Sequence, residues 1–195
     1  MGFKATKHFV TVVLTLFALI SHNINPTSAA SKSASTNFIK KSCSTTTYSS
    51  LCIKTLAPYA LSVGTSPLKL CNAALKAAVQ ATTNCSATVT KVSKQKGIGR
   101  PEALAIKDCI GDLKDAVNEL KQTLTAMGHL RDADKDFQWA NAKTYASAAI
   151  TDAETCVDGF LGRKVNPAVK KKIKSCVWGS EKHISNALAL INHLY

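Results

Sequence analysis

The chain has 195 residues, and 25 Lys and Arg against 12 Asp and Glu give it a formal net charge of +13. The length fits one domain, since domains average about 150 residues, and a hydrophobic content of 46% excludes a wholly disordered chain. Abundant alanine and only 6% aromatic residues argue against a β-sandwich and favour helices.

The first thirty residues have the pattern of a secretory signal peptide. Two lysines precede an uncharged stretch at 9–20, which as a helix would span about 18 Å, too short for a hydrocarbon core of roughly 30 Å. Small residues at 27–30 suit signal peptidase. The sequence therefore predicts that residues 1–30 are cleaved, and that the mature chain is secreted, oxidised and free of a membrane anchor.

Residues 31–64 are predicted to form an N-terminal helical hairpin. Two short helical pieces, 37–43 and 48–56, flank a run of Ser and Thr. Isolated helices of this length are marginal in water. Cys43 and Cys52 can meet across the turn, and a disulfide between them would fix both pieces.

Four longer amphipathic helices are predicted within residues 65–195. Apolar residues recur at steps of three and four, and Ser, Pro and Gly mark the ends of each run. The first helix runs from Pro67 toward Gly97, the second ends at Gly128, the third covers about 136–160, and the fourth follows Pro167. Short loops between such helices favour an all-α fold, an antiparallel up-and-down four-helix bundle.

The seven cysteines can be sorted by their places on these helices. Cys71 and Cys85 lie on one helix, about 21 Å apart, and cannot pair. Cys109 near the start of the second long helix and Cys156 near the end of the third become neighbours in an antiparallel pair, so a disulfide is expected there. Cys71, Cys85 and Cys176 are then expected to be buried core thiols.

Positive charge gathers in the first part of the mature chain. Residues 31–101 contain ten Lys and Arg and no Asp or Glu, whereas residues 102–195 are nearly balanced. Such a surplus suggests an acidic partner. Nucleic acid is disfavoured, because the chain is predicted to be secreted and no aromatic residues alternate with the basic groups.

The sequence contains no recognisable catalytic or metal-binding motif. It lacks a nucleophile elbow and a glycine-rich phosphate loop, and no spacing of Cys or His indicates a metal ion or other cofactor. The alternating Asp132, Asp134 and Asp136 lack the Gly and Glu of a calcium loop. A glycosylation sequon at Asn84 lies inside a predicted helix, which argues against its occupancy.

A set of short motifs spans the mature chain. They are Cys43 and Cys52 with eight residues between them, Asp-Cys at 108–109, Tyr-Ala-Ser-Ala-Ala at 145–149, Thr-Cys-Val-Asp-Gly-Phe at 155–160 and Ser-Asn-Ala-Leu-Ala-Leu at 185–190. Together they resemble the plant pectin methylesterase inhibitor and invertase inhibitor family over nearly all of the mature chain.

The resemblance implies a four-helix up-and-down bundle with an N-terminal hairpin, and disulfides Cys43–Cys52 and Cys109–Cys156. It also implies a protein that is not an enzyme and that binds a cell-wall carbohydrate enzyme in a one-to-one complex. A pectin methylesterase inhibitor covers the enzyme's pectin-binding cleft with the second and third bundle helices. Carried over by position, the contact residues would be Asp112, Asp115, Asn118, Thr155 and Asp158.

Two departures from the family pattern bear on the choice of enzyme. Gly111 and Asn118 stand where a well-matched inhibitor can carry acidic residues, so the resemblance leaves affinity and enzyme choice open. The Pro-Lys-Phe motif associated with invertase recognition is absent after Phe160, which favours the esterase as partner. The alternatives are an invertase inhibitor on the same scaffold and a basic cell-wall protein that binds pectin through residues 31–101.

Overall fold

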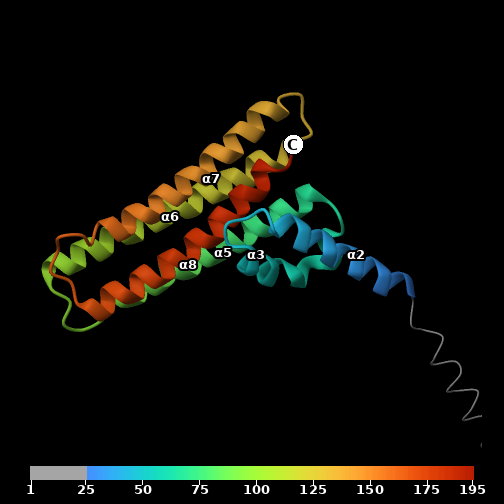
Figure 1. Cartoon of the computed structure of the whole chain (residues 1–195). Helices are drawn as coiled ribbons and strands as arrows, with labels where there is room; N and C mark the ends of the chain where they lie inside the picture. Colours follow the sequence, from blue (N-terminus) through green and yellow to red (C-terminus); the bar gives the residue numbers. More distant parts are fainter. Residues whose placement is uncertain (1–25) are drawn as a thin grey trace, which may run out of the picture.

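The computed structural model describes residues 26–195, so most of the predicted signal peptide lies outside the described residues. Within that range the chain is almost entirely helical and contains no strand, which confirms the all-α prediction (Figure 1). The elements are α2 (Pro26–Cys43), α3 (Ser49–Leu56), the 3₁₀ helix η1 (Ala57–Tyr59), α4 (Ala60–Val63), α5 (Pro67–Ser93), α6 (Arg100–Gly128), α7 (Lys135–Asp158) and α8 (Pro167–Asn192).

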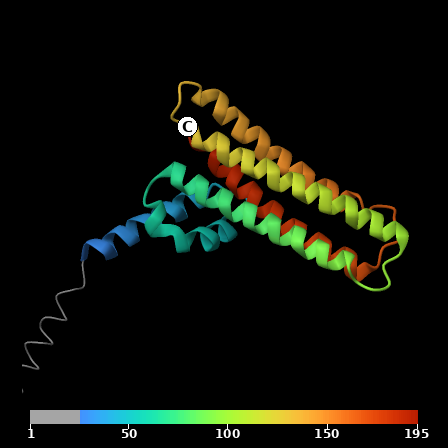
Figure 2. The ribbon, with the colours of Figure 1, turned by 180° about the vertical axis from the view of Figure 1, so that it is seen from behind.

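The four long helices α5 to α8 form an antiparallel up-and-down bundle, seen from two sides in Figures 1 and 2. Each of them packs against two others, and α5 and α8 close the bundle. Proline stands at the start of α5, α6 and α8, where a missing N–H costs nothing. The Asn166 side chain caps α8 by accepting a hydrogen bond from the backbone N–H of Ala168 at 2.9 Å.

Small residues allow α7 to pack closely against its neighbours. Ala142, Ala146, Ala149 and Ala153 recur at steps of three and four along one face, and each is fully buried. Larger side chains of α5, α6 and α8 fill the space opposite them, because interiors are packed to a uniform density. Some of the many alanines in the sequence therefore lie at the centre of the bundle, where small side chains let the helices approach closely.

The N-terminal helices pack across the outside of the bundle, against α5 and α8 (Figure 1). The side chain of Asn186 on α8 holds the turn of this hairpin in place. It accepts a hydrogen bond from the backbone N–H of Tyr48 and donates one to the carbonyl of Tyr48, both at 3.1 Å. Since Asn186 is only 4% exposed, both hydrogen bonds are largely shielded from water.

Helix α2 begins earlier than the sequence predicts. The expected helical piece starts at residue 37, whereas the structure begins the helix at Pro26. The hydroxyls of Ser35 and Thr36 donate to carbonyls four residues earlier, both at 2.8 Å, so these polar residues are accommodated within the helix. The predicted signal-peptide cleavage near residue 30 falls inside α2 and stays a prediction.

All seven cysteines lie within the described residues, and six of them form three disulfides. The structure contains Cys43–Cys52 in the hairpin and Cys109–Cys156 between α6 and α7. It also contains Cys85–Cys176 between α5 and α8, with Cα atoms 5.3 Å apart.

The prediction of buried thiols is therefore wrong for Cys85 and Cys176. The sequence pattern does not show that α5 and α8, the first and last helices of the bundle, hold these two residues at the same level. Cys71 is the one free cysteine, and burial raises the pKa of its thiol to about 12.

Candidate protein-binding face

A row of carboxylates follows the exposed side of α6 and continues onto α7. Asp108, Asp112, Asp115 and Glu119 lie four, three and four residues apart, a spacing that keeps them on one side of a helix. The buried positions between them, among them Cys109, Leu113, Ala116 and Leu120, face the core. We call Asp108, Asp112, Asp115 and Glu119 of α6, together with Asp152 of α7, the acidic stripe.

The carboxylates of the acidic stripe repel one another. Burial raises the pKa of Asp152, and the charge of Asp115 raises it further. Burial also raises the pKa of Asp112, and the surrounding carboxylates, Asp108 first, add to that shift. The pKa of Glu119 is raised by burial and then by Asp152, while a hydrogen bond from Gln122 opposes the shift.

Most of this negative charge has no partner within the described chain. Asp108 faces Arg163 at 3.9 Å, but in residues 26–195 no Lys or Arg forms an ion pair with the other four carboxylates. The Oε2 atom of Glu119 is buried and has no hydrogen-bond partner. Like charges held together at an energetic cost are typical of a surface that meets groups of opposite charge.

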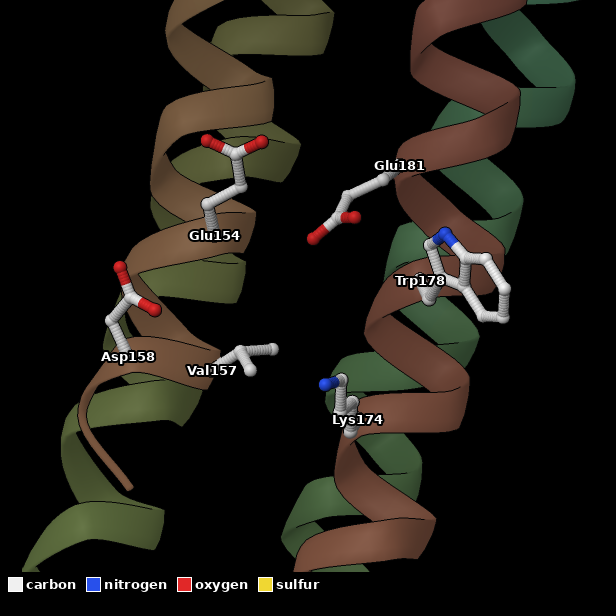
Figure 3. Close-up of a pocket in the computed structure, with 6 residues that line it drawn as sticks. All are labelled: Glu154, Val157, Asp158, Lys174, Trp178 and Glu181. Atoms are coloured by element: carbon white, nitrogen blue, oxygen red, sulfur yellow. The ribbon is translucent and has the colours of Figure 1, made fainter. Parts of the chain in front are cut away.

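A groove between α7 and α8 adds further carboxylates beside the stripe (Figure 3). It has a volume of about 430 Å³ and is lined by Glu154, Val157 and Asp158 of α7 and by Lys174, Trp178 and Glu181 of α8. In Figure 3 the Glu181 carboxylate and the Lys174 ammonium reach toward α7. Burial and the charges of Glu154 and Asp158 raise the pKa of Glu181, and Lys174 lowers it.

An exposed aromatic ring borders this groove. Trp178 is 55% exposed, and the Nζ atom of Lys182 lies 3.6 Å from the ring centroid. A cation over an indole face is a favourable contact. The groove thus combines an exposed aromatic side chain with three carboxylates.

The structure distributes four of the five residues predicted as contacts over three surfaces, and the fifth, Thr155, lies on none of them. Asp112 and Asp115 lie in the acidic stripe, close to Asp152. Asp158 lines the groove between α7 and α8, and Asn118 lines a groove between α5 and α6. Thr155 is exposed on α7, where its hydroxyl donates to the carbonyl of Thr151 at 2.9 Å.

The separation of Asn118 from Asp112 follows from helix geometry. Each step of three residues falls about 60° short of a full turn, so two steps shift a side chain by about 120° around α6. The spacing of the acidic residues in α6 could have predicted Asp108 and Glu119. The sequence pattern does not show how α7 packs against α6 and α8. Prediction of this face therefore misses Asp152, Glu154 and Glu181.

The remaining candidates lie away from this face. Asn84 is exposed in the middle of α5, where its Oδ1 atom accepts a hydrogen bond from Gln80. Asp132 contacts His129, and Asp134 accepts a hydrogen bond from Gln138. Across residues 26–195, no three His, Cys, Asp or Glu side chains are arranged to hold a metal ion. None of the described helices combines the length and apolar character needed to cross a membrane.

The fold places this chain in the class of disulfide-linked four-helix bundles. Two crystal structures of pectin methylesterase inhibitors from Arabidopsis match the fold, with TM-scores of 0.57 and 0.56. They are 21% and 18% identical in sequence, and the matches cover 78% and 80% of this chain and 94% and 95% of theirs. At these identities the likeness shows the fold alone.

The sequence comparisons show the family. Residues 37–190 match the family described as plant invertase/pectin methylesterase inhibitor, so the chain belongs to that family. Pectinesterase inhibitor 11 of Arabidopsis thaliana is 34% identical over 195 residues, with 96% of each chain covered. Pectinesterase inhibitor 9 of the same plant is 37% identical over 191 residues, which cover 94% of this chain and 91% of that protein. The resemblance found in the sequence motifs is confirmed.

Proposed function

We propose that the protein inhibits pectin methylesterase by binding the enzyme, and that it is not itself an enzyme. The observation that carries this proposal is similarity over nearly the whole chain to relatives named pectinesterase inhibitors. The complex contains one inhibitor and one enzyme, and α6 and α7 cover the pectin-binding cleft.

The acidic stripe supports the choice of α6 and α7 as the contact face. Asp115, Thr155 and Asp158 are exposed and Asp112 is partly exposed, so a partner can reach them. Asp115 and Asp152 are held together without a counter-ion in the described chain. Basic or hydrogen-bonding groups of a partner relieve that repulsion, which favours the complex over the free inhibitor.

The protein acts outside the cell, in the plant cell wall. Three disulfides in a chain of this size are typical of proteins that fold in an oxidising compartment. The signal peptide predicted at residues 1–30 supplies the route.

Inhibition assays against two enzymes test the function. Purified inhibitor is titrated into a plant pectin methylesterase and, separately, into an acid invertase from the cell wall. We expect the esterase to be blocked with an end point at one inhibitor per enzyme, and the invertase to keep its activity. Block of the invertase without block of any esterase would overturn the proposal.

A second candidate function is binding to pectin itself. It is favoured by residues 31–101, which carry ten basic residues and no acidic residue. Pectin with free uronate groups is a polyanion, the kind of partner that such a surplus attracts. Retention of the purified protein on immobilised polygalacturonate tests this function independently of any enzyme.

A further inference from the structure

A groove between α5 and α6 is lined by basic side chains, on the edge of α6 that faces away from α7. Lys91 lies in α5, Lys94 directly follows its last residue, and Lys114 and Lys121 lie in α6. The groove has a volume of about 620 Å³, and no carboxylate lines it. All four lysines are exposed, and none belongs to an ion pair within residues 26–195. We call this feature the lysine groove.

The lysines follow both rims of the groove, which suits a linear ligand. Lys114 and Lys121 are two helical turns apart, about 10.5 Å along α6, and Lys91 and Lys94 stand on the opposite rim. A single small anion would meet one or two of these ammonium groups. A chain with repeated negative charges can meet all four.

The groups between the lysines favour a sugar polymer over a nucleic acid. Thr83, Ser86 and Asn118 supply hydroxyl and amide groups, and Ala87 and Val117 supply a small apolar surface. Such a lining fits the hydroxyls and C–H faces of sugar rings. No aromatic side chain lines the groove, so bases would have no ring on which to stack.

We propose that the lysine groove binds a run of unesterified uronate residues in pectin. This inference rests on the second candidate function, binding to pectin, and assigns that function to one groove. Two of the four lysines of the groove, Lys114 and Lys121, lie outside the basic segment 31–101. Lysine ammonium groups pair with carboxylates but gain no charge interaction with a methyl ester. The groove therefore distinguishes de-esterified pectin from esterified pectin.

Binding to polygalacturonate by two matched variants tests the groove. One variant replaces Lys91, Lys94, Lys114 and Lys121 with Gln, and the control replaces four exposed lysines elsewhere, Lys40, Lys54, Lys69 and Lys76, with Gln. Both lose the same net charge, and circular dichroism checks that both stay helical. We expect roughly ten- to hundredfold weaker binding for the groove variant and a change within about threefold for the control.

The outcomes separate the groove from the function on which it rests. No binding by the unchanged protein would overturn pectin binding altogether. Binding by the unchanged protein with equal losses in both variants, or with no loss in the groove variant, would overturn the groove alone.

A second experiment compares ligands of different charge. We expect binding to fall steeply as the degree of methyl esterification of the pectin rises. Equal binding to highly esterified pectin would overturn the role of the carboxylates. Duplex DNA is tested at the same salt concentration. If it binds the groove as tightly as polygalacturonate does, the groove is a general polyanion site and the assignment to uronate is overturned.

Discussion

Single carboxylates of the acidic stripe carry both an energetic cost and the proposed contact with the enzyme. Asp115 raises the pKa values of its neighbours Asp112 and Asp152, and it is exposed. Removing or reversing one charge of this group therefore changes stability and binding in ways that can be measured separately.

Replacing Asp152 with Asn should stabilise the free protein at neutral pH. Since the pKa of Asp152 is raised in the folded state, stability falls as the pH rises from about 4 through the folded pKa, and the penalty is complete above it. Water still screens this half-buried group, so we expect a Tm about 1–2 °C higher at pH 7. The difference should vanish near pH 3, where the carboxyl is protonated in both states.

Thermal unfolding of the unchanged and Asp152→Asn proteins at both pH values measures this effect. Burial lowers the pKa of His183, so its protonation destabilises the fold as the pH falls through about 6.5. That contribution is common to both proteins and cancels in the comparison. Asp136→Asn, an exposed site near the other end of α7, serves as the control, and a Tm rise in the control as large as in Asp152→Asn would contradict the explanation.

Replacing Asp115 with Lys should weaken inhibition of pectin methylesterase by about tenfold or more. The substitution puts a positive charge where the proposed contact face is negative, at an exposed position that helix packing does not use. The inhibition constant measures the effect, and circular dichroism should show unchanged helicity. Asp136→Lys makes the same charge change away from the stripe, and an equal loss in both variants would argue against α6 as the contact face.

The sequence predicts the members of the acidic stripe only in part. The family pattern singles out Asp112 and Asp115 on α6 as contact residues, and that role stays a prediction. Asp152 escapes prediction because its proximity to Asp115 depends on the register between α6 and α7. The periodicity of a helix tells which side is buried, but not which residue of the next helix lies beside it.

The sequence predicts the long helices better than it predicts the disulfides between them. Apolar residues at steps of three and four define α5 to α8, and proline or glycine marks their starts or ends. The start of α2 is missed because its Ser and Thr residues have a low helix propensity. In the structure the hydroxyls of Ser35 and Thr36 bond to carbonyls of the preceding turn within the helix. The disulfide Cys85–Cys176 is missed because it depends on how the bundle closes.

Counting free thiols tests the disulfides. Unfolded but unreduced protein should show one reactive thiol, that of Cys71, and the Cys71→Ala variant should show none. Three thiols in the unchanged protein would contradict the Cys85–Cys176 disulfide.

Loss of the Cys85–Cys176 disulfide should destabilise the bundle by about 4 kcal/mol. The Cys85–Cys176 disulfide closes a loop that contains the Cys109–Cys156 disulfide. The inner disulfide shortens the effective loop to about 45 residues, and this length gives the expected loss. Denaturant unfolding of the Cys85→Ala/Cys176→Ala double variant measures the loss, with Cys71→Ala as a control that keeps all three disulfides. A double variant as stable as this control would contradict the entropic argument.

The hairpin should loosen when Asn186 is replaced with Ala. The substitution leaves the N–H and carbonyl of Tyr48 without their partner on α8, at a cost of about 1–3 kcal/mol. Limited proteolysis at the 44–48 turn and denaturant unfolding measure the change. Asn192→Ala, at the exposed end of the same helix, should leave both unchanged; equal cleavage of the two variants would contradict the role of Asn186.

Across the whole molecule, α6 carries two surfaces of opposite charge on its two edges. Carboxylates gather where α6 meets α7, and lysines gather where it meets α5. The sequence predicts the surplus of positive charge but not this arrangement. The basic segment 31–101 is divided among the hairpin, α5, the loop after α5 and the start of α6. The lysine groove takes two of its four lysines from α6.

Neutralising the lysine groove should therefore leave enzyme inhibition intact. Because the groove and the acidic stripe lie on different edges of α6, we expect the four-lysine variant to inhibit pectin methylesterase within about threefold of the unchanged protein. Inhibition constants measured at one ionic strength provide the comparison. A loss as large as that of Asp115→Lys would show that the enzyme contacts both edges.

The burial of Cys71 protects the three disulfides from attack by the chain's own free thiol. Exchange between disulfides begins with attack by a thiolate, and a pKa of about 12 leaves only about one thiol in 10⁵ ionised at pH 7. Since Cys71 is also 1% exposed, the folded protein contains no competent nucleophile of its own. Without an added thiol, exchange started by Cys71 requires unfolding, so a heated sample can rearrange its disulfides while a native one keeps its pairing.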